Sequence, residues 1–129
     1  MKTSNLLKYM LGGHAEFHIE IKGIQSDYII NKKNDAWFIN ASEGKQNDWR
    51  YLGCISSFCI LYFTRSEFEP TTPVRSSFDF VWRFARDKKD IIDSRLKIWN
   101  NGICSVCGRQ LKTEESCNIG IGPECLKKI

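Results

Sequence analysis

The sequence lacks any long hydrophobic run. In its 129 residues no stretch of about 18 apolar residues occurs, the length at which a membrane-spanning helix becomes a candidate. The first residues hold only two short apolar pairs, Leu6-Leu7 and Met10-Leu11, which are too short for the apolar part of a secretory signal peptide. We therefore expect a protein of the cytoplasm, without a membrane partner.

Catalytic signatures are also missing. The sequence contains no nucleophile elbow, no phosphate-binding loop and no metalloprotease helix motif, and Gly120-x-Gly122 before a proline is too little for a phosphate cradle. Only two histidines occur, His14 and His18, on the polar side of an alternating segment. Four residues along a strand separate them by about 13 Å, too far to share a metal ion. We expect both to be solvated surface residues, and we predict that the protein is not an enzyme and has no small-molecule substrate.

The composition is that of a folded protein. Hydrophobic residues make up 42% and aromatic residues 12%, which is ordinary for a globular domain and too high for a disordered chain. The net charge of +4 is uneven, because residues 95–129 carry six Lys and Arg against three acidic residues. This bias permits contact with phosphate groups without requiring it.

Hydrophobic periodicity predicts an α+β fold. A short helix is expected over residues 2–11, and alternation over 14–22 predicts a half-buried strand. After a turn at 23–27, further strands are expected at 28–30, 36–40, 49–55 and 58–64, and a last one at 95–99. Phe78, Val81, Trp82 and Ala85 follow helical spacing after a cap at Ser76 or Ser77. We predict an antiparallel meander of about five strands packed by one main helix, followed by a treble-clef-like zinc finger, with residues 1–94 as one domain and 95–129 as a closely coupled finger.

The strongest motif lies in the last quarter of the chain. Cys104 and Cys107 are two residues apart and are followed by Gly108, a spacing typical of a zinc knuckle. Cys125 follows Gly122-Pro123, which predicts a short helix with this cysteine in its first turn, where a thiolate is favoured. Two disulfides and a redox pair are alternatives, but a reducing compartment favours a metal.

The fourth ligand is the least determined. Cys117 lies between the two pairs and would complete a four-sulfur site that leaves no open position for a reactive water. The remaining cysteines, Cys54 and Cys59, are expected to be small buried residues in or beside strands.

The motif resembles that of a known family. Cys-x2-Cys-Gly-Arg-x-Leu, Glu-Ser and Gly-Ile-Gly-Pro-x-Cys are similar to the C-terminal zinc finger of a family of small uncharacterised phage and prophage proteins, and the likeness continues upstream at 11–13, 37–38, 51–53 and Trp99. That family often has a histidine after the tryptophan, where this chain has Asn100, and an aliphatic residue where it has Cys117. The resemblance implies a phage-type protein in a bacterial host, a zinc ion and a fourth ligand that has moved to Cys117, but no known activity.

Two functions fit these features. The first is a non-catalytic, nucleic-acid-associated binding module, suggested by six basic residues in and around the finger: Arg95, Lys97, Arg109, Lys112, Lys127 and Lys128. The second is a protein that binds and inhibits a host defence or nucleic-acid-processing complex, for example an anti-CRISPR protein. Such an inhibitor would present either the polar loop 43–48 or the polar strand face with Glu16, His18 and Glu20.

Overall fold

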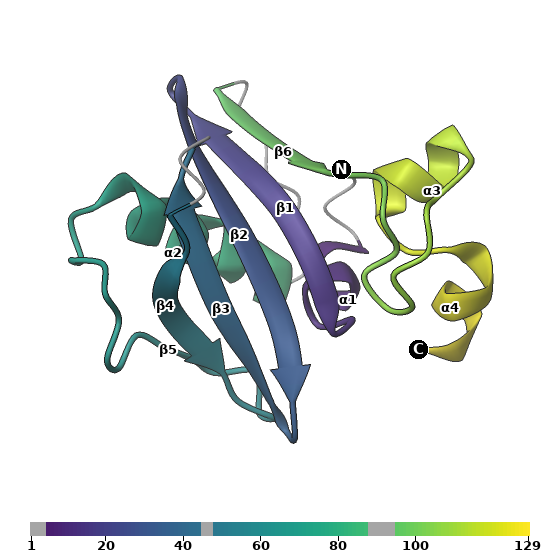
Figure 1. The fold of residues 1–129 in the computed structure, drawn as a ribbon, viewed down its shortest axis with the longest axis horizontal. Helices are drawn as coiled ribbons and strands as arrows, with labels where there is room; N and C mark the ends of the chain where they lie inside the picture. The colour runs from purple at the N-terminus through teal and green to yellow at the C-terminus, as the bar shows by residue number, and fades with distance from the viewer. Residues whose placement is uncertain (1–4, 45–47, 88–94) are drawn as a thin grey trace.

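A computed structural model describes residues 5–44, 48–87 and 95–129. The chain forms a six-stranded antiparallel sheet with helices packed against it, and the C-terminal segment lies beside the sheet (Figure 1). The α+β class is therefore confirmed, with one more strand in the sheet than the predicted meander. The strand order is β5-β4-β3-β2-β1-β6. None of the described helices combines the length and the apolar character that crossing a membrane requires.

The elements occur in the following order: α1 (Leu6–Met10), β1 (His14–Ile21), β2 (Ile24–Lys33), β3 (Ala36–Glu43), β4 (Arg50–Ile55), β5 (Leu61–Tyr62), α2 (Pro73–Asp87), β6 (Leu96–Asn100), α3 (Glu114–Ile119) and α4 (Pro123–Lys128). The first five strands form the meander. β6 then pairs antiparallel with β1, at the opposite edge of the sheet from β5. This pairing brings the start of the C-terminal segment next to the first strand.

Several predicted boundaries differ from the structure. The turn expected at 23–27 is only two residues long, because Lys22 and Gly23 both have positive φ and β2 begins at Ile24. β5 has two residues in place of the seven predicted. α2 begins at Pro73, ahead of the predicted serine caps, since proline is compatible with the first turn of a helix. The predicted domain boundary at residue 94 and part of the predicted N-terminal helix lie outside the described residues.

Aromatic side chains form the centre of the core between the sheet and α2. Phe17 of β1 stacks on Tyr28 of β2 with 5.3 Å between ring centroids, and Phe78 of α2 lies 5.2 Å from the Tyr28 ring. The Tyr28 hydroxyl donates a hydrogen bond of 2.7 Å to the Val74 carbonyl, so its polar group is satisfied inside the core. The core also includes Cys104, Leu111 and Ile121. The C-terminal segment therefore shares the hydrophobic core of the sheet domain.

Candidate metal centre

Residues 101–111 form a tight knuckle that carries two of the cysteines. The Gly108 N–H donates to the Cys104 carbonyl at 2.9 Å, and the Cys104 N–H donates to the Arg109 carbonyl at 2.9 Å. Gly108 has φ +77°, a conformation that glycine adopts without steric cost. An isolated bridge between Ile103 and Gln110 closes the knuckle. The chain therefore reverses immediately after Cys107.

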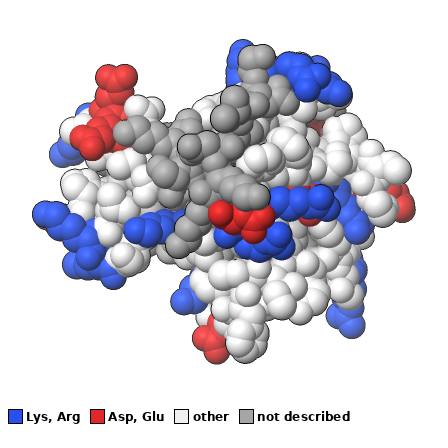
Figure 2. Space-filling model, turned by 180° about the vertical axis from the view of Figure 1, so that it is seen from behind, with Lys and Arg blue, Asp and Glu red and all other residues white. Residues whose placement is uncertain are grey.

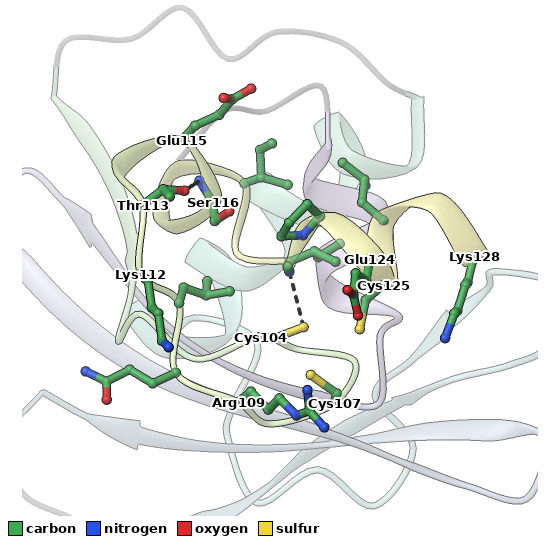
Figure 3. A pocket seen from close by; sticks show the side chains of 17 residues that line it. Cys104, Cys107, Arg109, Lys112, Thr113, Glu115, Ser116, Glu124, Cys125 and Lys128 are labelled. Atoms are coloured by element: carbon green, nitrogen blue, oxygen red, sulfur yellow. Dashed lines mark hydrogen bonds between the residues drawn. The ribbon is translucent and has the colours of Figure 1, made fainter.

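Cys125 comes to the same place from helix α4. Gly122 is the N-cap of this short helix and Pro123 begins it, as the sequence predicts. The Gly122 N–H donates a hydrogen bond of 3.3 Å to the Cys104 sulfur. This bond ties the start of α4 to the knuckle and directs Cys125 toward the other two thiols (Figure 3).

The Sγ atoms of Cys104, Cys107 and Cys125 all lie within 4.8 Å of one another, so these three residues could hold a metal ion. Burial raises the pKa of the Cys104 thiol, but hydrogen bonds from the backbone N–H groups of Gly122, Cys107 and Val106 outweigh burial and lower that pKa to about 7. A hydrogen bond to the Cys107 thiol, burial and the nearby Cys104 raise the pKa of Cys125 to about 11. The protein thus stabilises the Cys104 thiolate by itself, while the two neighbouring thiols oppose ionisation of Cys125.

Cys117, predicted as the fourth ligand, is not part of this cluster. It lies on α3, whose N-cap Thr113 accepts a hydrogen bond of 3.1 Å from the Ser116 N–H. The Cys117 thiol faces the Leu111 carbonyl, with 3.9 Å between sulfur and oxygen. The side-chain amide of Asn100 donates a hydrogen bond of 2.8 Å to the Cys117 carbonyl. The orientation of α3, which spacing in the sequence does not determine, places this thiol outside the group.

Two close contacts join the cysteine-bearing segment to the sheet domain. A side chain at Gly12 would collide with the Ser105 backbone at 2.9 Å, and the Ser105 carbonyl accepts a hydrogen bond of 2.7 Å from the His14 N–H. A side chain at Gly120 would collide with the Tyr9 ring, with 2.3 Å to its Cδ1 atom. Both glycines therefore allow the segment to lie directly against α1 and the start of β1.

A cleft of ≈ 830 Å³ opens beside the cysteine cluster. It is lined by all three cluster cysteines and by three of the six predicted contact residues, Arg109, Lys112 and Lys128. Arg109 lies next to Cys107, and Lys112 and Lys128 lie on opposite sides of the cluster (Figure 3). Two carboxylates, Glu115 and Glu124, also line the cleft. The structure thus brings three cations from separate parts of the segment to one opening.

The other three predicted contact residues do not line this cleft. Lys97 lies on β6, where its Nζ is 3.7 Å from a carboxylate oxygen of Glu20. Arg95 precedes β6 and its carbonyl accepts a hydrogen bond from the Lys22 N–H at 3.3 Å. Lys127 is exposed on α4 but is not a lining residue. On the face seen from behind, separate groups of basic side chains lie among uncharged residues and a few acidic ones, without forming a continuous basic surface (Figure 2).

His18 is a residue whose environment the sequence did not indicate. His14 is exposed, as predicted, but the His18 ring lies between two partners, with Nδ1 2.6 Å from an Asp27 carboxylate oxygen and Nε2 2.7 Å from the Asn101 side-chain oxygen. It also stacks on Trp99 with 5.3 Å between centroids. The expectation of a solvated histidine is therefore wrong here, because β6 pairs with β1 and covers the ring. Alternation along one strand cannot reveal a neighbour that arrives 81 residues later.

The remaining cysteines, Cys54 and Cys59, are half-buried instead of fully buried. Neither is a member of the cluster found among the described residues.

Comparison with known proteins identifies a relationship for the cysteine-bearing segment. Residues 100–129 match a family described as a family of unknown function, DUF6011. The match contains all three clustered cysteines and does not extend to the upstream likenesses noted at 11–13, 37–38 and 51–53. No curated protein and no solved structure matches the chain. The C-terminal segment is therefore similar to a recognised family whose function is not known.

Proposed function

We propose that this protein is a zinc-stabilised, non-catalytic binding module of phage type that associates with nucleic acid through the cleft beside its cysteine cluster. Three thiolates are ligands that zinc prefers, so Cys104, Cys107 and Cys125 would hold the ion. A structural role for the metal is supported by the burial of Cys104 and Ile121 in the common core. The metal would then fix the shape of a segment too small to build its own core.

The observation that carries the nucleic-acid proposal is the convergence of Arg109, Lys112 and Lys128 on one cleft. All three side chains belong to exposed residues, which suits contact with backbone phosphates. Two acidic residues, Glu115 and Glu124, also line the opening, so the cleft is not uniformly basic. Binding through few phosphate contacts is expected to be weak and strongly dependent on salt.

A gel-shift titration tests the proposal with single- and double-stranded DNA and RNA at low and moderate salt. Replacing Arg109, Lys112 and Lys128 together with Ala is expected to abolish retardation. The matched control replaces three exposed cations elsewhere, Lys33, Arg83 and Arg86, and is expected to retain it. For duplex DNA the slope of log affinity against log salt is expected to be about −0.9 per phosphate contacted. Absence of retardation at low salt, or equal loss in both variants, refutes the proposal.

A second candidate function is that of a protein that binds and inhibits a host complex, such as an anti-CRISPR protein. It is supported by exposed apolar side chains around β5: Phe58 is 84% exposed, and Ile60 and Tyr62 are each 47% exposed. Phe38 and Tyr62 both pair with Cys54, so they point to the same face of the sheet. Exposed apolar groups in such proximity are typical of protein-binding surfaces.

The inhibitor function is tested by comparing capture of host proteins on wild-type protein and on a Phe58→Ser variant. A defined partner retained by the wild type and lost by the variant supports this function. If the wild type and the variant retain a partner equally, or if neither retains a partner, the inhibitor function is contradicted. The polar loop 43–48 named earlier as a contact surface includes residues 45–47, which are outside the described part of the chain.

A further inference from the structure

The cysteine cluster supplies three ligands where zinc in proteins is nearly always four-coordinate. No other Cys, His, Asp or Glu ligand atom in the described residues lies within 4.8 Å of all three sulfurs. The segments 1–4, 45–47 and 88–94 contain no cysteine and no histidine. Every thiol and imidazole of the chain therefore has a described position, and only three of them gather at the cluster.

The remaining thiols and imidazoles are engaged or distant. Cys117 faces the Leu111 carbonyl, and both ring nitrogens of His18 have oxygen partners. His14 is exposed beside the knuckle, where its backbone N–H donates to the Ser105 carbonyl, but its imidazole is not in the cluster. Cys54 pairs with Tyr62 near the far edge of the sheet. A fourth sulfur or imidazole from this chain would require a change in the position of α3 or of the His14 side chain.

The cluster is open on one side. Cys104 is fully buried, whereas Cys107 is exposed and Cys125 is half-buried, so the group lies at the surface of the cleft. The cleft of ≈ 830 Å³ is large enough to admit a side chain or a small molecule at the sulfurs. Three thiolates and one Zn²⁺ carry a net charge of about −1, and the cations Arg109, Lys112 and Lys128 beside them reduce the cost of a further anionic ligand.

We infer that the metal held by Cys104, Cys107 and Cys125 keeps a fourth position open to the cleft, and that this position takes a thiolate from outside the chain. This thiolate belongs either to a cysteine of a bound protein or to a small thiol, since both offer the same sulfur ligand. This inference depends on the zinc-binding part of the proposed function but not on nucleic-acid binding. Catalytic zinc sites have three protein ligands and one exchangeable position, and here a thiolate would take that position in place of a reactive water.

Cobalt substitution of the full-length protein tests the inference, because Co²⁺ reports its thiolate ligands by charge-transfer absorption. The protein is kept reduced with a phosphine, so that the sample contains no thiol other than the protein's own cysteines. Titration with 2-mercaptoethanol is expected to increase the charge-transfer absorbance saturably by about one third, since a fourth thiolate joins three. Ethylene glycol, the matched probe without sulfur, is expected to change nothing.

Two variants examine whether the chain closes the site itself. Cys117→Ser and His14→Gln are each expected to leave the starting spectrum and the thiol response unchanged, because neither group belongs to the cluster. A spectrum altered by either variant, or a wild-type spectrum that does not respond to thiol, overturns the inference. Failure to obtain tetrahedral cobalt–thiolate bands overturns it together with zinc binding.

Glutathione and a short uncharged peptide with one cysteine, each titrated separately, distinguish the two sources. Saturation at lower concentration by glutathione indicates a small thiol, and saturation at lower concentration by the peptide indicates a protein cysteine. The gel-shift assay is independent of these spectra. If the protein shows the thiol response but does not bind nucleic acid, only the proposed function is refuted. If it binds nucleic acid but does not respond to thiol, only the open fourth position is refuted.

Discussion

The sheet domain and the C-terminal segment are held together by different interactions. The sheet domain buries large aromatic side chains, among them Phe17, Tyr28, Phe78 and Trp82, between six strands and α2. Residues 101–129 contribute only three buried hydrophobic residues to that core, Cys104, Leu111 and Ile121. The first region obtains its stability from apolar burial, which requires no ligand. The second depends on its contact with α1 and, under our proposal, on a metal ion.

The largest effect is expected from removing an aromatic ring in the sheet domain. Phe17→Ala deletes a fully buried ring that contacts Tyr9, Tyr28 and Phe78. We expect a loss of about 3–5 kcal/mol in the free energy of unfolding, equal with and without zinc. Urea unfolding followed by tryptophan fluorescence measures it. If the loss in free energy of unfolding differs with and without zinc, the stability of the sheet domain also depends on the metal.

Metal removal should act on the C-terminal segment alone. We expect Cys104→Ser, or an excess of chelator on the wild type, to cost several kcal/mol locally and to expose the amides of Cys104, Leu111 and Gly120 to hydrogen exchange. Amides of β1 to β4 should stay protected. Cys54→Ser is the matched control, since this thiol is outside the cluster. Protection of residues 101–129 in excess chelator would contradict a structural metal.

A smaller effect is expected where the two regions touch. Gly120→Ala combines a positive φ of 81° with a collision against the Tyr9 ring, so we expect a loss of about 2–3 kcal/mol, felt mainly by the C-terminal segment. Gly23→Ala is the control, because Gly23 has the same φ of 81° and no atom within 4 Å of an added side chain. It should cost only about 1 kcal/mol. Equal losses in the two variants would show that the contact with Tyr9 contributes nothing.

The smallest effect concerns pH. The pKa of Cys104 is lowered to about 7 and that of Cys125 is raised to about 11. Above pH 7 Cys104 is already largely a thiolate, whereas Cys125 still holds a proton that the metal must displace. We therefore expect apparent zinc affinity to rise with pH between pH 8 and 10, because fewer protons have to be displaced from Cys125 as the pH approaches its pKa. Competition with a chromophoric chelator measures it, and a pH-independent affinity would contradict this assignment.

The site illustrates how far spacing in the sequence can be taken. The sequence predicts Cys104, Cys107 and Cys125 as cluster members and the structure confirms it, because a two-residue spacing before glycine and a glycine-proline helix start are local signals. The position of Cys117 between them predicts the same group, but the structure places this thiol beside the Leu111 carbonyl. The direction in which a helical side chain points depends on how its helix packs, which no local signal records.

For this protein, the sequence by itself determined the α+β class, the order of the meander strands and the three clustered thiols. Each follows from hydrophobic periodicity or from residues that are neighbours in the chain. Only the tertiary structure decided that β6 pairs with β1, that His18 lies between Asp27 and Asn101, and that Arg109, Lys112 and Lys128 meet at one cleft. These arrangements join residues that are distant in the chain, and they are set by which surfaces pack together when the whole core forms.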